Sequence, residues 1–340
     1  MKTKEKNSFS IFDFFDPNGN DKLSDLSGMS LLDLVVLIDD MYISYRDNLC
    51  YSPDITFGIE LEFEKALKDK IEESFNKFSL DSWILKDEIN IKDGAEVNSP
   101  ILVDNASNWK ELRRVCLQIQ KYGVIGEKCG GHIHIGAQMI GSEINSWLNF
   151  LRLWSVYENI IYRFSCGEFL SCRRGISYFA IPMALKFDDL YNLFKKLNFD
   201  LQFLLANLCS SRMQAVNFCH IDKQNIDCFN DGNTFEIRCN MGTLNYIIWQ
   251  NYVNFYLAFV NYCKSNNFNY DIVDKRYKLV CDKFCNLRLY NEVYIEQALE
   301  LSDMIFDKNI DKFYFLRQYF KSLEVSNDFI KAKRFTKKRF

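Results

Sequence analysis

Histidine is scarce in this sequence, yet two of its three histidines stand two positions apart in CGGHIHIG, residues 129–136. Because side chains alternate along a β-strand, a strand here would direct His132 and His134 to the same side. Imidazoles bind metal ions and exchange protons near neutral pH. Taken alone, the pair also fits an ordinary strand with two polar surface residues, so its meaning depends on what lies beside it.

Two further stretches show the same alternation of polar and apolar residues. FGIELEF directs Glu60 and Glu62 to one side, and TFEIRC does the same with Glu236 and Arg238. A fourth stretch, GAEVNSPIL, contributes Glu96 shortly before a Ser-Pro pair that should end a strand or confine it to an edge. Desolvated charges are costly unless they are paired or bound to a metal. The repetition in three strands therefore favours one shared polar site over three unrelated surface strands.

The chemistry of this set indicates the kind of ion it would hold. Carboxylate oxygens are the preferred ligands of Mg²⁺ and Mn²⁺, and one added imidazole is compatible with either ion. The sequence holds neither a GxxxxGK[ST] nor a GxGxxG phosphate-binding loop. Any nucleotide would therefore have to be held in another way.

The hydrophobic pattern predicts an α+β fold with a largely antiparallel sheet. Strands are expected at 55–63, 82–86, 95–102, 131–136, 214–219 and 233–239. Helices are expected at 30–45, 65–78, 107–122, 143–165, 245–264 and over most of 287–323. DPNGNDKLSDLS, residues 16–27, approaches a calcium-loop pattern but has Ser27 where the loop needs a bidentate glutamate, so a turn is expected there.

The composition is that of an ordinary globular protein, with 48% hydrophobic and 26% charged residues in 340. The net charge of −3 gives no reason to expect nucleic acid or an acidic membrane as the partner. The amino-terminal residues lack the apolar core of a signal peptide, so a cytoplasmic protein is expected. The 12 cysteines contain no CxxC pair and are expected to be reduced. The basic tail, KAKRFTKKRF, is interpreted as a solvated end.

FGIELEF, GAEVNSPI, CGGHIHIG and TFEIRCNMGTLN, in this order, resemble the amidoligase family. That family belongs to the carboxylate–amine ligases that share the glutamine synthetase catalytic fold. The resemblance covers about 55–260 and implies a curved sheet with one face lining the active site and the other covered by helices. It implies a catalytic domain, expected at 51–265. Outside it we expect an amino-terminal extension with one amphipathic helix (1–50) and a helical carboxy-terminal extension with the basic tail, packed on the catalytic domain (266–340).

The resemblance also implies the reaction. Such ligases transfer the γ-phosphoryl group of ATP to a carboxylate, and an amine then attacks the acyl phosphate to give an amide. The implied cofactors are ATP and Mg²⁺ (or Mn²⁺), and the implied partners are a small-molecule or peptide carboxylate and an amine. No nucleic-acid or membrane partner is expected, and the oligomeric state stays open.

The resemblance assigns roles residue by residue. The implied catalytic residues are Glu60, Glu62, Glu96, Glu236 and Arg238. The implied metal ligands are Glu60, Glu62, Glu96, His132 and Glu236. The residues implied to bind substrate or ATP are His134, Arg238, Arg174, Tyr178, Arg212, Asn217 and Thr243, with Gly242 in its expected place. His220 has no support from a motif and is interpreted as structural or exposed.

Three other functions stay open from the sequence. A phosphotransferase on the same fold would use the same metal and ATP sites to phosphorylate a guanidino group or an amine. An HxH metal-dependent oxygenase or hydrolase would use His132 and His134 with a third histidine, and His220 is the one remaining. A non-catalytic relative would bind a peptide or a nucleotide.

Overall fold

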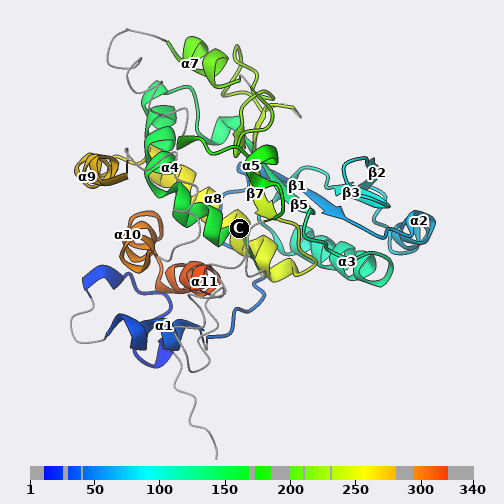
Figure 1. Cartoon of the computed structure of the whole chain (residues 1–340), viewed down its shortest axis with the longest axis horizontal. Coiled ribbons are helices and arrows are strands. Elements are labelled where there is room, and N and C mark those ends of the chain that lie inside the picture. Colours follow the sequence, from blue (N-terminus) through cyan, green and yellow to red (C-terminus); the bar gives the residue numbers. More distant parts are fainter. Residues whose placement is uncertain are drawn as a thin grey trace, which may run out of the picture.

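A computed structural model describes residues 11–25, 30–39, 41–167, 173–184, 200–209, 211–229, 232–280 and 294–320. The architecture is α+β, with an open antiparallel sheet beside a group of helices (Figure 1). Its strands are β1 (Thr56–Phe63), β2 (Ile84–Glu88), β3 (Gly94–Asn98), β4 (Leu102–Val103), β5 (Gly130–Gly136), β6 (Val216–Asn217) and β7 (Thr234–Met241). Their order is β2-β3-β1-β5-β7-β6, and β4 also pairs with β1. The predicted α+β class is therefore confirmed.

Helices occupy much of the rest of the described chain. They are α1 (Leu31–Asp39), α2 (Lys68–Lys77), α3 (Ala106–Tyr122), α4 (Ile144–Phe164), α5 (Ile176–Phe179), α7 (Leu201–Leu208), α8 (Tyr246–Lys264), α9 (Tyr270–Val280), α10 (Ile295–Ile305) and α11 (Asn309–Phe320), with short 3₁₀ turns η1 (Ile11–Asp13), η2 (Leu23–Asp25) and η3 (Ala137–Met139). None of these helices is both long enough and apolar enough to cross a lipid bilayer.

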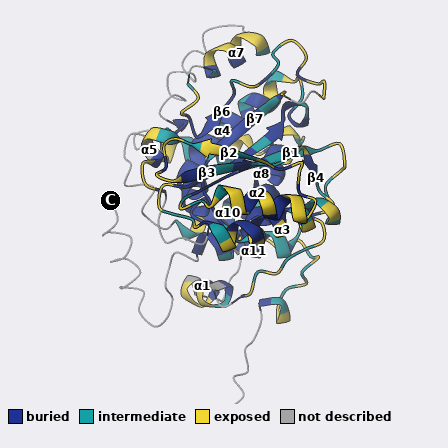
Figure 2. Ribbon diagram, turned by 90° about the vertical axis from the view of Figure 1, so that its right-hand side faces the viewer, coloured by how far each residue is buried: buried dark blue, intermediate teal, exposed yellow. Residues whose placement is uncertain are grey.

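The apolar face of the sheet packs on aromatic side chains from the long helices. Phe57 of β1 stacks on Trp109 of α3 with ring centroids 5.2 Å apart. Phe235 of β7 meets Phe150 of α4 edge-on at 5.6 Å. Figure 2 shows this interior as a continuous buried layer in the sheet and the helices behind it. The alternation in β1 and β7 thus has the predicted cause, since one face of each strand is packed in the core.

Some predicted helix boundaries are wrong because contacts with distant segments determine where the helix ends. The helix expected over 30–45 ends at Asp39, and the chain beyond it is held by other segments. The backbone N–H of Ser44 donates to the Tyr314 hydroxyl, and that of Arg46 donates to Gln250 Oε1. Helix α7 was not predicted, and α9 lies within the extension that was expected to be helical (266–340), ahead of the helical stretch expected from 287. Residues 281–293, expected to be partly helical, and the basic tail at 331–340 lie outside the described residues.

The two extensions meet each other through a polar cluster, which we call the terminal clasp and define as Asp21, Asp303, Asn309 and Lys312. Asn309 and Lys312 are buried, Asp303 is half-buried and Asp21 is exposed. Asn309 donates from Nδ2 to Asp21 Oδ2 at 2.7 Å, and its Oδ1 accepts from the Asp21 N–H at 2.9 Å. Lys312 donates to the Asp21 carbonyl at 2.5 Å and to Asp303 Oδ1 at 3.1 Å. The segment that approached a calcium-loop pattern is thus a turn bound by an amide and an ammonium group.

The clasp brings the amino-terminal segment onto a helical layer that also supports the sheet. α11 contacts α1 on one side and both α4 and α8 on the other. Figure 1 shows α1, α10 and α11 grouped beside α4 and α8, away from β2 and β3. The division of the chain at residues 50 and 265 stays a prediction.

Candidate active site

The polar residues of the central strands lie side by side on the sheet face that the long helices leave open. In the antiparallel register, Glu60 of β1 pairs with His132 of β5, and His134 pairs with Glu236 of β7. On the other side of β1, Glu62 pairs with Glu96 of β3. The sheet therefore brings together residues from sequence positions 60 to 236 by strand pairing alone.

His132 lies at the centre of the carboxylates and is 3% exposed. Its Nδ1 is 3.0 Å from Glu60 Oε2 and 3.2 Å from Glu236 Oε1, and its Nε2 is 3.6 Å from Glu62 Oε1. Ligands at right angles around a Mg²⁺ ion with bonds of about 2.1 Å are separated by about 3 Å. The separations around Nδ1 thus fit a shared ion as well as they fit hydrogen bonds.

His134 contacts the same glutamate from the other side. Its Nε2 is 3.1 Å from Glu60 Oε1, and its Nδ1 is 3.2 Å from Thr234 Oγ1. Burial alone would lower the pKa of His134, but the carboxylate of Glu60 outweighs burial and raises it. Burial would raise the pKa of Glu60, but hydrogen bonds from His132 and His134 hold it far below its usual range.

Glu96 behaves in the opposite way. Burial, together with the negative charges of Glu60 and Glu62, raises its pKa from 4.5 to about 7. Glu62 and Glu96 face each other directly across two strands, an arrangement that is unfavourable for like charges. Glu88 of β2, which the sequence analysis missed, joins them on this side. A divalent cation here would relieve this repulsion.

Three sets of residues in the described chain have ligand atoms close enough to hold one metal ion. Within each set the ligand atoms lie within 4.8 Å of one another; the sets are Glu60 with Glu96 and His132, Glu60 with His134 and Glu236, and Glu62 with Glu88 and Glu96. Carboxylate oxygen dominates all three, and two include one imidazole. These donors suit Mg²⁺ or Mn²⁺, so the residues present fit the predicted metal.

Two guanidinium groups border the carboxylates. Arg238 pairs with Glu236, as its position in the same strand allows, and its Nε donates to the Phe179 carbonyl at 3.4 Å. The second is Arg173, which the sequence analysis did not select. Its Nη1 lies 3.6 Å from Glu62 Oε2 and 3.4 Å from His132 Nε2.

Arg174 and Tyr178, which were predicted to reach ATP or substrate, lie outside this cluster. The side chain of Arg174 is 69% exposed and pairs with Glu127 at 2.7 Å. Tyr178 is exposed and packs edge-on against Phe179 at 5.0 Å. In the RRGISY segment the structure thus directs the first arginine inward and the second outward.

The remaining predicted residues occupy different positions. Asn217 is buried and donates to Glu236 Oε2 at 2.8 Å, so it orients that carboxylate. Thr243 is buried, and its Oγ1 accepts from the Asn245 N–H at the start of α8. Arg212 is exposed.

His220, interpreted from the sequence as structural or exposed, has an exposed side chain but lies beside the cluster. Its Nε2 is 3.8 Å from Glu236 Oε2, and its ring centroid is 5.9 Å from that of His134. It follows β6 in an irregular segment, so strand periodicity could not predict its position. Its ligand atoms form no metal-sized group in the described part of the chain.

The glycines before His132 have a use that the sequence did not reveal. They make room for this chain's own side chains. A Cβ at Gly130 would lie 1.6 Å from Arg173 Nη1, and one at Gly131 would lie 2.6 Å from the Trp249 ring. Gly130 also donates its N–H to Glu62 Oε2 at 2.6 Å. These glycines therefore fix an arginine on one face of the strand and a tryptophan on the other.

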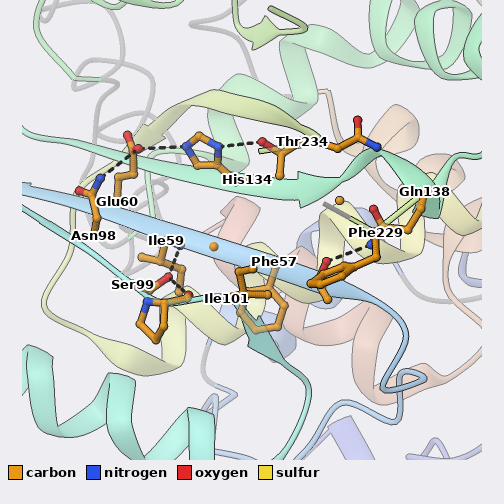
Figure 3. A pocket seen from close by; sticks show the side chains of 15 residues that line it. Phe57, Ile59, Glu60, Asn98, Ser99, Ile101, His134, Gln138, Phe229 and Thr234 are labelled. Carbon is orange, nitrogen blue, oxygen red and sulfur yellow. Dashed lines mark hydrogen bonds and ion pairs between the residues drawn. The ribbon is translucent and has the colours of Figure 1, made fainter. Parts of the chain in front are cut away.

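A cavity of about 170 Å³ opens on the same face beside Glu60 and His134. Gly58 and Gly136 leave room at its floor, and Ile101 and Phe229 line it as partly exposed apolar side chains. Figure 3 shows Glu60, His134 and Thr234 in a row along one side, with Phe229 and Gln138 at the far end. The cavity thus has a polar side, along Glu60, His134 and Thr234, and an apolar part formed by side chains such as Ile101 and Phe229.

Comparison with known sequences agrees with this geometry. The sequence profile of a family described as "Putative amidoligase enzyme" matches residues 57–260, which include every strand from β1 to β7. No curated protein sequence matches the chain.

Proposed function

The chain belongs to the amidoligase family, and from that premise we propose that it is an ATP-dependent carboxylate–amine ligase with a glutamine synthetase-like catalytic sheet. The observation that carries the proposal is the cluster of carboxylates and imidazoles beside a half-apolar cavity on one sheet face. A triphosphate needs concentrated positive charge along its length, and a nucleoside needs an apolar slot next to it. The two features adjoin at Glu60 and His134.

In this proposal the base and ribose of ATP occupy the cavity, between Ile101 and Phe229. The residues that would hold Mg²⁺ are Glu60, Glu62, Glu96, His132 and Glu236. A metal ion held by these residues would supply charge neutralisation of the phosphates and make the γ-phosphorus more electrophilic. Asn217 keeps the carboxylate of Glu236 in position, and Arg238 provides a cation for the transferred phosphoryl group.

The reaction has two steps. A carboxylate oxygen of the first substrate attacks the γ-phosphorus, the bond to the bridging oxygen breaks, and ADP leaves. The amine of the second substrate then attacks the acyl carbon, phosphate leaves, and the nitrogen loses a proton as the amide forms. Neither step needs a protein nucleophile, and the cluster provides orientation and electrostatic stabilisation.

The test is a screen of the purified protein with ATP, Mg²⁺ and pairs of carboxylates and amines, with ADP measured and products weighed by mass spectrometry. We expect ADP, phosphate and an amide in equal amounts. A stable phosphorylated amine or guanidino product would identify a phosphotransferase instead. Turnover that requires iron or zinc and does not depend on ATP would favour an HxH oxygenase or hydrolase.

A further inference from the structure

Arg173 is a buried cation that the proposed chemistry has not yet used. It is 3% exposed and lies against Glu62 and His132, at the end of the cluster away from the cavity. Its guanidinium is 5.2 Å above the Phe179 ring. Burial of an arginine is expensive, so a buried arginine in a binding face needs an explanation beyond the filling of space.

The surrounding chain holds this guanidinium in one place. Gly130 leaves the space that Nη1 occupies, because a Cβ there would lie 1.6 Å from it. The residue after Arg173 donates its N–H to the Glu127 carbonyl at 2.6 Å, and Gly175 takes a left-handed backbone with φ of 82°. The backbone on the carboxyl side is therefore fixed in a turn that directs Arg173 inward.

The N–H donors of Arg173 make only long hydrogen bonds, or none, to the described residues. Its contacts to Glu62 and His132, at 3.6 and 3.4 Å, are longer than a good charge-assisted hydrogen bond of about 2.8 Å. Its Nε is buried and has no hydrogen-bond partner in the part of the chain that the structure describes. A buried donor without an acceptor is costly, and an incoming oxyanion would remove that cost.

A second cation borders the same space. Burial and, after it, the positive charge of Arg238 lower the pKa of Arg173. The Arg173 guanidinium lies over the Phe179 ring, whereas Arg238 Nε donates to the Phe179 carbonyl, so both cations border this residue. Like charges in one buried site repel each other, and an anion bound between them would turn that repulsion into attraction.

The position along the strands separates this place from the cavity. The cavity reaches Gly136 at one end of β5, whereas Arg173 packs on Gly130 at the other end. Six residues of extended strand span about 20 Å. A base seated at the Gly136 end of the cavity has Glu60 and His132 between it and Arg173. The Arg173 end is then left to the far end of a bound triphosphate or to a second substrate.

We propose that Arg173 and Arg238 form an oxyanion-binding site at the end of the cluster opposite the cavity. The ligand is the carboxylate of the acyl substrate or the terminal phosphate of ATP, which share the planar or tetrahedral oxygens that a guanidinium fork recognises. This inference rests on the proposed ligase function, because it places the two reacting groups over the same metal ligands. It adds Arg173 to the residues that contact substrate.

Calorimetric titration tests the site with Mg²⁺·ADP, Mg²⁺·AMP-PNP and inorganic phosphate, the last with and without Mg²⁺·ADP. In the Arg173→Met protein we expect phosphate affinity to fall at least tenfold, while Mg²⁺·ADP affinity stays within twofold. Arg173→Lys keeps the positive charge but lacks the planar guanidinium. Its phosphate affinity should lie between those of the unmodified protein and the Arg173→Met protein. Arg174→Met is the matched control and should bind all three probes as the unmodified protein does.

The AMP-PNP measurement separates the two sources of the oxyanion. A tenfold loss for AMP-PNP without a loss for ADP identifies the terminal phosphate. Unchanged AMP-PNP affinity with a loss for phosphate identifies the second substrate's anion. Phosphate that does not bind the unmodified protein, or binds all three proteins equally, overturns the site.

The proposed function fails separately, when the unmodified protein binds no Mg²⁺·ADP. Thermal melting of each variant verifies the fold, and Arg173→Lys carries the test if Arg173→Met does not fold.

Discussion

The terminal clasp and the active-site cluster are both polar assemblies of ionisable side chains, but they satisfy their carboxylates differently. In the clasp, neutral amide and backbone N–H donors supplement the ammonium group, whereas in the cluster Glu62 faces Glu96. In the clasp, Lys312 is 1% exposed and meets the carboxylate of Asp303, while Asn309 uses both its Nδ2 and its Oδ1 on neighbouring chain. In the cluster, four carboxylates (Glu60, Glu62, Glu96 and Glu236) face two guanidinium groups (Arg173 and Arg238). One assembly satisfies itself, and the other has an excess of acceptors.

This difference indicates what each assembly is for. Buried polar groups that satisfy one another hold segments together, and removal of one partner leaves the other uncompensated. Buried carboxylates that repel one another cost stability and are retained at sites that bind positive charge. We therefore expect substitutions in the clasp to lower stability and substitutions in the cluster to abolish turnover.

The largest effect is expected from the central carboxylates. Glu60→Gln or Glu236→Gln keeps the size of the side chain and removes a metal-ligating charge. Because metal-assisted charge stabilisation is worth several kcal/mol, ADP release should fall by about a thousandfold or more. Glu73→Gln, on the exposed face of α2, is the control and should leave the rate unchanged. ADP release that persists in both cluster variants would contradict the assignment of the site.

A substitution in the clasp should lower the stability of the protein and leave its turnover unchanged. Lys312→Met removes the ammonium group from Asp303, which is 11% exposed and keeps the backbone donors of Leu23 and Ser24. The loss of this hydrogen-bonded charge pair should cost about 1–3 kcal/mol. Urea unfolding should show this loss, while the folded protein should keep its ADP-release rate. Lys308→Met, four residues earlier and only half-buried, should change stability by less than about 0.5 kcal/mol. If Lys312→Met abolished turnover with its stability unchanged, the two assemblies would not be distinct.

The proton on Glu96 gives a pH-dependent test. Its pKa in the folded chain is raised from 4.5 to about 7, so the folded state binds more protons than the unfolded state between these values. The contribution of Glu96 to stability is therefore present at low pH and is lost as pH rises through about 7. With the discount that partial exposure requires, the loss is about 1–2 kcal/mol.

Mg²⁺ should reverse this loss, because a cation replaces the proton. The melting temperature should therefore rise more on addition of Mg²⁺ at pH 8 than at pH 5.5. Glu96→Gln should flatten the metal-free pH profile over this range. An equal response to Mg²⁺ at both pH values would argue against a metal ion at Glu96.

The smallest expected effect concerns the cavity. Phe229 is 59% exposed, so its truncation to alanine should leave the free energy of unfolding almost unchanged. If the base of ATP packs on this ring, Phe229→Ala should weaken nucleotide binding by about three- to tenfold. Phe14→Ala removes a similarly exposed ring from the amino-terminal segment and serves as the control. Equal affinities in the two variants would move the base away from this cavity.

Strand periodicity allowed much of the cluster to be predicted. Glu60, His132 and Glu236 alternate with apolar neighbours, and that alternation requires a two-faced sheet whatever the details of packing. The helices with a wide apolar stripe, such as α4 and α8, were likewise predicted to within about two residues.

The residues that were not predicted lie where polar and apolar residues do not alternate regularly along the sequence. Arg173 and Arg174 are adjacent and identical, and only the turn at Gly175 decides which of them is buried. Glu88 lies on the edge strand β2, whose register with β3 no local pattern fixes. His220 lies in an irregular segment after β6. Such positions follow from tertiary docking, which one sequence does not reveal.

The terminal clasp can form only late in the synthesis of the chain. It joins Asp21 to Asn309 and Lys312, so the amino-terminal segment must wait until nearly 300 further residues have been added. At about 5–20 residues per second, that interval is about 15–60 s. Meanwhile the apolar side chains of Ile11 and Leu23, both buried in the finished protein, have no docking surface. The nascent chain therefore exposes these apolar side chains for most of its translation.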